Sequence, residues 1–365
     1  MKEVRFLQKF SMGTEILAGP GAIETLGERG ARRLFLVTDP YFAENGWADR
    51  IAAQVNGEAV EIFKDVTPDP SLRMAAEGTA RFQKFRPDLL LALGGGSAMD
   101  TAKAILYFSR QKVAFGAIPT TSGSGSEVTD FSILTHEGVK HPLVDPGIRP
   151  DFAILDSDLL QQLPKGLIAD AGFDVLSHAL EAWVGRNAGC FSDLYAKEAF
   201  SLAYGNLLGS YQGDLSKRLP MHLASCMAGI AFTHAGLGLC HGLSHSLGGR
   251  FHVPHGRLNA IFLPRVILAN AQAGAGERYG QLAMRSGLCT GSKTLGIRNL
   301  ISGLTRLRRQ LELPGSLREA GIPEKDFHSA LQGLVDAALR DPCCGTNPVP
   351  VTEAMARQVL EDSYG

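Results

Sequence analysis

The sequence lacks an excess of charge of either sign, and this argues against several classes of partner. Of its 365 residues, 36 are basic and 37 are acidic, so the formal net charge at pH 7 is -1. Proteins that bind nucleic acid or an anionic surface through their charge usually carry a strongly basic face. We therefore expect neither nucleic acid nor a membrane among the partners of this chain.

Long apolar runs are also missing. A membrane-spanning helix needs roughly 18 or more consecutive apolar residues, and no such stretch occurs in the sequence. The opening residues, "MKEVRFLQKFSMGTEILAGPG", contain neither an uninterrupted apolar segment nor a small-residue cleavage site. We therefore predict no membrane span and no secretory signal, and we expect a cytoplasmic location.

Cysteine is scarce, and its spacing does not fit a disulfide framework or a thiolate metal site. The six cysteines are scattered, and no CxxC pair occurs among them. This pattern is typical of free thiols in a reducing compartment. We interpret the adjacent pair Cys343 and Cys344 as structural or incidental.

The first part of the sequence alternates short apolar runs with helical stretches. The run "DLLLAL" is apolar throughout, as in a strand that is buried on both faces. Such alternation predicts βαβ units and a mostly parallel sheet. Strands are expected at residues 33–38, 60–63, 88–93, 115–121 and 152–156, with helices at 48–55, 71–85 and after residue 97.

Beyond about residue 160 the periodicity becomes helical and strand-like runs nearly disappear. We therefore predict two domains, an N-terminal α/β domain with a parallel sheet (residues 1–160) and an all-helical C-terminal domain (residues 161–365). The break is expected near Pro164. Helices are expected at 163–184, 192–208, 218–231, 242–248, 257–271, 275–286, 295–311 and 327–339.

Two glycine-rich loops each follow a predicted strand. In the first, Gly94–Ser97, backbone N–H groups at a helix start can cradle a phosphate, although a tight turn would need the same glycines. The second, "IPTTSGSGSEVT", is expected to open another helix, with a solvated linker as the alternative. Neighbouring βα units would bring the two loops to one sheet edge, where together they could enclose a diphosphate.

Asp39 ends the first of the predicted strands, in "LVTDP". A carboxylate there can bind both hydroxyls of an adenine ribose and repel a 2′-phosphate, which favours NAD over NADP. The alternative is a structural turn in which Asp39 binds the backbone ahead of Pro40.

Histidine is concentrated in one place. The chain has 10 histidines, and four of them lie in "HGLSHSLGGRFHVPHG", residues 241–256. His241 and His245 are four residues apart on a predicted helix, as are Asp174 and His178 on another, and a loop returns the chain to His255.

Two such pairs and a histidine from a loop can converge on one Fe(II), Zn(II) or Mn(II) ion. The alternative is that each histidine is an ordinary core residue, as we expect for His222, His252 and His328. Spacing does not decide which of His241 and His245 would be a ligand.

These motifs together resemble the iron-containing alcohol dehydrogenase family almost end to end. The resemblance rests on "GGGSAMDTAKA", "IPTTSGSGSEVT", "AGFDVLSHALEAW", "AGLGLCHGLSHSLGG" and "PHGRLNAI". Within the family, the chain looks most similar to the 1-propanol dehydrogenases of bacterial diol-degrading microcompartments. His234 stands where the family commonly has asparagine or another small polar residue.

The resemblance implies a function for particular residues. The metal ligands implied are Asp174, His178, His241 and His255, and His245 is implied to lie beside the metal. The NAD contacts implied are Asp39, Gly95, Gly96, Ser97, Asp100, Thr120, Thr121, Ser124 and Lys140. It further implies a homodimer, with Fe(II) or alternatively Zn(II) as the metal.

The expected activity is reversible hydride transfer between NAD(H) and a short primary alcohol or aldehyde, such as 1-propanol and propionaldehyde. His245 is expected to relay the alcohol's proton. The residues expected to supply apolar walls are Phe131, Phe232, Leu237, Leu239 and Phe251. The alternatives are a glycerol or polyol dehydrogenase, a dehydroquinate-synthase-like lyase, and a non-catalytic binding protein.

Overall fold

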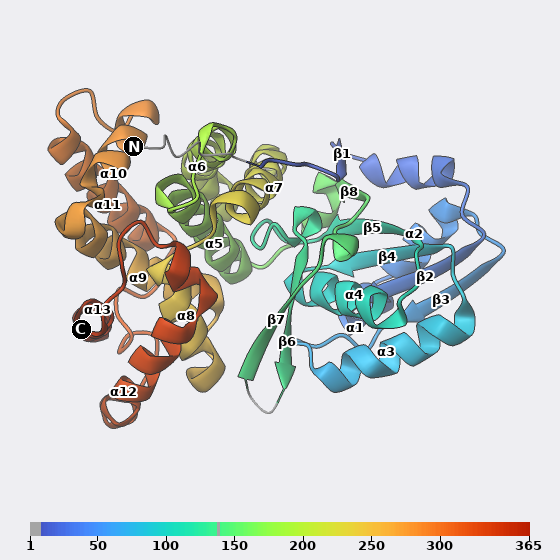
Figure 1. Cartoon of the computed structure of the whole chain (residues 1–365). Coiled ribbons are helices and arrows are strands. Elements are labelled where there is room, and N and C mark those ends of the chain that lie inside the picture. Colours follow the sequence, from blue (N-terminus) through green and yellow to red (C-terminus); the bar gives the residue numbers. More distant parts are fainter. Residues whose placement is uncertain (1–8, 137–138) are drawn as a thin grey trace, which may run out of the picture.

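The computed structural model describes residues 9–136 and 139–365. One part is a six-stranded sheet whose strand order is β1-β8-β5-β4-β2-β3, with every neighbouring pair parallel (Figure 1). The strands are β1 (Glu15–Ala18), β2 (Arg33–Thr38), β3 (Ala59–Phe63), β4 (Leu89–Gly94), β5 (Ala114–Pro119) and β8 (Phe152–Leu155). The predicted fold class and the five predicted strands are confirmed, whereas β1 was not foreseen.

Helices cover both faces of this sheet, which explains why β4 is apolar at every position. Leu89 and Leu91 pack on one side with residues of the 3-10 helix Ala22–Arg29 and of α2 (Trp47–Val55). Leu90 and Ala92 pack on the other side with α3 (Leu72–Phe85) and α4 (Gly96–Ser109). A short helix, α1 (Pro40–Glu44), follows β2 directly.

The prediction of a helix after the second glycine loop was wrong. Only a single 3-10 turn, Ser126–Val128, follows the loop, and the chain then forms a hairpin of β6 (Phe131–His136) and β7 (Val139–Val144). The buried ammonium of Lys103, on α4, explains this because it binds the carbonyl oxygens of Ser126 at 2.7 Å and Phe131 at 2.9 Å. A carbonyl bound to a side chain in this way favours a turn at Ser126 over a longer helix.

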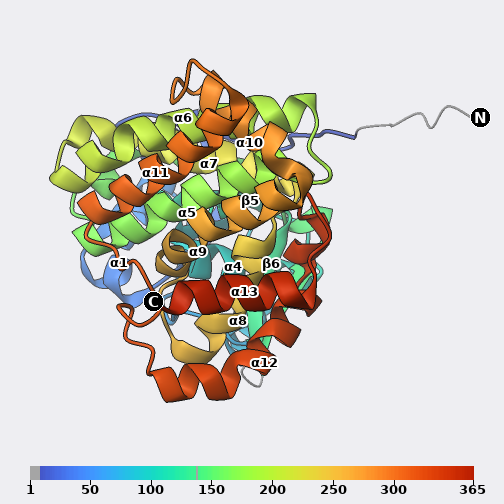
Figure 2. The same cartoon turned by 90° about the vertical axis from the view of Figure 1, so that its left-hand side faces the viewer.

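The rest of the chain is helical, and no strand occurs among the described residues after 160 (Figure 1 and Figure 2). Its helices form one apolar core. They are α5 (Lys165–Val184), α6 (Cys190–Gln212), α7 (Arg218–Ala235), α8 (Leu239–Phe251), α9 (His255–Asn270), α10 (Gly276–Arg285), α11 (Lys293–Gln310), α12 (Glu324–Arg340) and α13 (Glu353–Tyr364). The helix α13 was not predicted, and α8 is longer than expected, so only residues 252–254 separate it from His255.

None of the described helices is by itself long and apolar enough to cross a membrane. The stretches Leu215–Ala235 and Leu239–Phe251 would pass that test as a pair, on length and composition alone, with a bend of 105° between them.

The two parts of the molecule meet where the second glycine loop lies against α7. A Cβ atom at Gly125 would lie 2.7 Å from the Cα of Gly229, and one at Gly229 would lie 2.5 Å from the carbonyl oxygen of Gly125. Contacts this short leave no room for a side chain on either backbone. The position of the loop therefore depends on two facing glycines.

We predict that Gly229→Ala destabilises the protein by about 1–3 kcal/mol, because the new methyl group must push the loop away. The matched control is Gly205→Ala in the exposed part of α6, where no atom lies within 4 Å of the new Cβ. That change should be neutral or stabilise by about 0.5–1 kcal/mol, because alanine favours helix. Thermal unfolding of both variants checks this, and equal melting temperatures would contradict it.

Candidate metal centre and cofactor cavity

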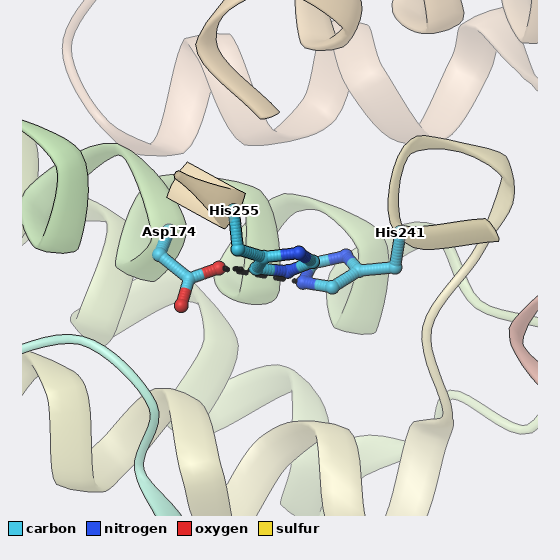
Figure 3. Close-up of side chains that lie close together, drawn as sticks. All are labelled: Asp174, His241 and His255. Carbon is cyan, nitrogen blue, oxygen red and sulfur yellow. Dashed lines mark ion pairs between the residues drawn. The ribbon is translucent and has the colours of Figure 1, made fainter. Parts of the chain in front are cut away.

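Three imidazoles from three helices converge on one oxygen of the Asp174 carboxylate. Asp174 and His178 lie one turn apart on α5, His241 lies on α8, and His255 is the first residue of α9. The Oδ1 atom of Asp174 is 3.6 Å from Nε2 of His178 and 3.5 Å from Nε2 of both His241 and His255. Figure 3 shows the imidazoles of His241 and His255 pointing toward this oxygen.

The start of α9 can approach α5 closely because Gly256 has no side chain. A Cβ atom there would lie 1.9 Å from the carbonyl oxygen of Asp170, one turn before Asp174. Next to it, the guanidinium of Arg257 donates two hydrogen bonds, of 3.2 and 3.0 Å, to the carboxylate of Asp170. Close backbone approach and a bidentate ion pair thus fix His255 beside Asp174.

Glu181, one turn beyond His178 on α5, orients His241. Its buried carboxylate accepts the Nδ1–H of His241 at 2.6 Å and the backbone N–H groups of Gly238 and Cys240 at 2.9 and 2.7 Å. With Nδ1 occupied in this way, Nε2 of His241 faces Asp174. Burial lowers the pKa of His241, but the nearby carboxylates of Glu181 and Asp174 outweigh it and raise the pKa to about 9.

Asn259 orients Asp174 from α9. Its Nδ2 donates to Oδ1 of Asp174 at 2.8 Å, while its own Oδ1 accepts the hydroxyl of Ser244 at 2.6 Å. Glu181 and Asn259 were both missed as functional residues, although each lies within a motif quoted above. A possible signal is their spacing, since Glu181 and Asn259 each lie about one helical turn after a predicted ligand, His178 and His255.

The donor set fits a divalent metal ion. Burial lowers the pKa of His178 to about 4 and that of His255 well below its usual value, so both imidazoles are neutral, whereas His241, whose pKa is raised, must release its Nε2 proton when a metal binds. Burial alone would raise the pKa of Asp174, but the histidines around it outweigh this effect and lower it, so its carboxylate stays ionised. Three imidazole nitrogens and one carboxylate oxygen suit Fe(II) or Zn(II).

His245 lies beside this group rather than in it. Its ring stacks on that of His255, with centroids 5.1 Å apart, and its Nδ1 pairs with the carboxylate of Asp341 at 2.8 Å. Burial would raise the pKa of Asp341, but the hydrogen bond from His245 outweighs this and lowers it to about 2. Asp341 lies 96 residues away in the chain and was not anticipated from the sequence.

A cavity of about 600 Å³ lies at the carboxyl edge of the sheet. The two glycine loops pack against each other there, since a Cβ atom at Gly95 would lie 3.4 Å from the Thr121 hydroxyl. Leu163, Pro164 and Leu167 line the cavity on the side of the helical part. Six of the predicted cofactor residues line it, namely Asp39, Gly95, Gly96, Ser97, Thr120 and Thr121.

The other three predicted cofactor residues are not among those that line the cavity. Ser124 lies against Gly96, where a Cβ atom would come within 3.4 Å of it. Asp100 is half-buried on α4, behind the first loop. Lys140, on β7, forms an ion pair with Asp69 at 2.8 Å.

Asp39 caps a helix, as one of its two sequence interpretations predicts, and it also lines the cavity. Its Oδ1 accepts the backbone N–H of Phe42 at 3.1 Å and so caps α1. The same side chain borders the cavity, and its Oδ2 lies 3.7 Å from where a Cβ atom of Gly94 would be. The turn and a role in ribose binding are therefore compatible.

His234, where this chain differs from the common family pattern, contacts the N-terminal segment and is not one of the residues grouped around Asp174. Its Nε2 lies 3.1 Å from the carbonyl oxygen of Ser11, and its ring packs on Phe10 at 4.3 Å. Burial lowers its pKa. His234 therefore holds the segment that leads into β1.

A parallel sheet with two glycine loops, next to helices that present a three-histidine and aspartate site, defines a metal-dependent, dinucleotide-linked class of enzyme. Comparison with known proteins identifies the family. Residues 13–157 match the family model "Iron-containing alcohol dehydrogenase", and residues 168–364 match "Fe-containing alcohol dehydrogenase family, C-terminal".

Individual relatives match nearly the whole chain. A 1-propanol dehydrogenase, PduQ, of Salmonella typhimurium is 37% identical over 98% of this chain and 100% of its own length. An NADPH-dependent butanol dehydrogenase of Clostridium saccharobutylicum is 34% identical, with 98% of each covered. The solved structure of a sulfoacetaldehyde reductase from Bifidobacterium kashiwanohense in complex with NAD+ is 25% identical, with a TM-score of 0.89 over 98% of each chain.

This chain belongs to the iron-containing alcohol dehydrogenase family. It is accordingly an NAD-linked oxidoreductase that interconverts alcohols and aldehydes, with iron as its metal. The predicted family, enzyme class and cofactors are confirmed.

We predict that Glu181→Gln weakens metal binding about 10- to 100-fold, because an amide holds the Nδ1–H of His241 less firmly than a carboxylate does. The matched control is Glu198→Gln on α6, whose side chain is 47% exposed and which should leave the affinity unchanged. Titration of the metal-free proteins against a competing chelator measures both. An unchanged affinity in Glu181→Gln would show that the contact does not support the site.

Proposed function

We propose that the chain interconverts short primary alcohols and their aldehydes, 1-propanol and propionaldehyde among them, using NAD(H) and iron. The observation that carries this proposal is the convergence of three imidazoles on the Asp174 carboxylate. The similarity to a 1-propanol dehydrogenase supports the substrate class.

In this proposal Asp174, His178, His241 and His255 hold the metal, with Zn(II) as the alternative to Fe(II). When bound, the metal supplies a Lewis acid for the alcohol oxygen, and NAD supplies the hydride acceptor. The side chain of His255 is 33% exposed, whereas His178 and His241 are buried, so the open side of the group lies toward His255.

His245 is proposed to accept the alcohol's proton. The ionised carboxylate of Asp341 holds the Nδ1–H of His245, which leaves Nε2 as the atom that takes up and releases a proton. The side chain of His245 is 27% exposed, so the proton can pass on to solvent. In this role Asp341 acts as a positioning residue.

An aromatic wall beside the metal ligands supports a preference for small substrates. The ring of Phe232 packs on the imidazole of His178 at 4.5 Å, and Phe131 packs on Phe232 at 5.9 Å. Leu237, Leu239 and Phe251 belong to or pack against the helical core. Bulky rings next to a metal site leave room for few carbon atoms.

For the cofactor, the proposal assigns the diphosphate to the two glycine loops and the adenine ribose to Asp39. Their N–H groups, the hydroxyls of Thr120 and Thr121, and the helix start at Gly96 all provide donors for an anion. Asp100, Ser124 and Lys140 complete the proposed set from behind and beside the cavity.

We further propose a domain boundary between residues 160 and 161. The gap between β8, which ends at Leu155, and α5, which begins at Lys165, supports it, as does the division between the family models. The proposed homodimer, cytoplasmic location and microcompartment association rest on the resemblance to 1-propanol dehydrogenases. A glycerol or polyol dehydrogenase remains the alternative within the same chemistry.

Metal-stripped protein should form no NADH from 1-propanol and should regain activity when Fe(II) or Zn(II) is added back. Asp174→Ala should retain no metal and show no recovery, whereas the exposed control Asp326→Ala on α12 should behave as wild type. NADH absorbance over a panel of alcohols, diols and glycerol measures this and ranks the substrates. Full turnover without divalent metal, or no net NADH from any alcohol as for a lyase, would refute the proposal.

Replacing Asp39 by serine should raise kcat/KM with NADP relative to NAD by about 10-fold or more. Removing the carboxylate ends its repulsion of a 2′-phosphate, which can cost several kcal/mol, while serine still caps α1. The matched control is Asp49→Ser, an exposed position on α2 that is not among the cavity-lining residues. If the ratio of the two efficiencies does not change, Asp39 does not read the ribose.

A further inference from the structure

A second cluster of metal-ligating side chains lies next to the metal centre and uses none of its four ligands. Nδ1 of His245 lies 2.8 Å from Oδ2 of Asp341, and the Sγ of Cys343 completes a group whose ligand atoms lie within 4.8 Å of one another. Cys343 belongs to a 3-10 turn, Pro342–Thr346, that Asp341 caps by accepting the backbone N–H of Cys343 at 2.8 Å. The turn therefore holds carboxylate and thiol on the same side as His245.

We infer that His245, Asp341 and Cys343 form a second cation site beside the metal centre, which takes Zn(II) or a similar divalent transition metal. Imidazole nitrogen, carboxylate oxygen and thiolate sulfur are the three ligand types that zinc takes. In a tetrahedral zinc site such atoms lie roughly 3.3–3.8 Å apart, given bonds of about 2.0–2.3 Å. Small side-chain rotations reach that geometry, and partial exposure of all three residues lets a solvated ion enter.

The charges around the cluster favour a cation. Burial raises the pKa of the Cys343 thiol well above its usual value, and the negative charges of Asp341 and Glu181 raise it further. The same negative potential that holds the thiol protonated attracts a divalent ion, and the ion in turn releases the thiol proton to solvent. Zinc binding should therefore weaken as the pH falls.

Occupation of this site has a direct consequence for His245. Zinc bound to Nδ1 of His245 displaces the proton that Asp341 holds there. The neutral ring then carries its one proton on Nε2, so Nε2 no longer accepts a proton from the alcohol. Excess zinc should therefore inhibit the enzyme without removing metal from the first site. This inhibition rests on the proposed function, whereas the binding does not.

Cobalt(II) provides a test that does not depend on activity. The first site contains no sulfur, so cobalt bound there gives no sulfur-to-metal charge-transfer band, whereas cobalt bound to Cys343 does. Holoenzyme titrated with Co(II) should develop this near-ultraviolet band, and zinc should bleach it. Cys343→Ser should lose the band, whereas the control variants Cys344→Ser and Cys190→Ser, at a buried neighbour and an exposed thiol, should retain it.

Metal content and zinc inhibition give the second measurement. Wild-type protein dialysed against excess zinc should hold one more metal ion per chain than Cys343→Ser, as counted by mass spectrometry. The zinc concentration for half-inhibition should rise at least about 10-fold in Cys343→Ser, with each variant normalised to its own zinc-free activity. Equal metal content in wild type and Cys343→Ser, or a cobalt band that survives in Cys343→Ser, would overturn the second site. An extra ion in wild type without inhibition would refute only the role of His245.

Discussion

The structure depends on keeping one ionised carboxylate, that of Asp174, buried among three imidazoles. An isolated buried charge is costly, and the site compensates with polar partners rather than with solvent. Asn259 donates to Asp174, Glu181 fixes His241, and the close approach at Gly256 brings His255 to the same oxygen. Three of the four proposed ligands, Asp174, His241 and His255, are therefore held by a contact from another helix.

In the α/β part of the molecule, too, a buried polar side chain holds a segment of backbone in place. Lys103 has no exposure to solvent and donates to Ser126, Thr129 and Phe131. This anchors the second glycine loop to α4, the helix that the first loop opens. The cavity edge is thus a single unit, although its residues come from separate βα connections.

Much of the fold could be predicted from the sequence because local pattern determines it. The apolar run of β4 indicated a strand covered on both faces, and Pro164 marked the start of α5. The hairpin β6–β7 could not be foreseen, since the loop before it resembles a helix start and the contacts of Lys103 with Ser126 and Phe131 come from a distant part of the chain. The strand β1 was missed because its four residues are too few to show a period, and it depends on pairing with β8.

The candidate site divides in the same way. The four-residue spacing of Asp174 and His178 needs nothing beyond the helix to bring them onto one face. Spacing could not distinguish His241 from His245, which are equivalent on α8. Partners from elsewhere distinguish them, because Glu181 takes Nδ1 of His241 and Asp341 takes Nδ1 of His245. Such long-range pairings leave no local trace in a single sequence.

The facing glycines 125 and 229 also bear on whether the two parts of the molecule are interchangeable between relatives. The backbone of each glycine occupies the space that a side chain on the other would need. Because both positions are already glycine, a larger residue at one cannot be compensated by a smaller residue at the other. A chimaera that joins this sheet to another helical half would fit only where that half also carries a bare backbone at the seam. The seam thus restricts which helical halves can be combined with this sheet.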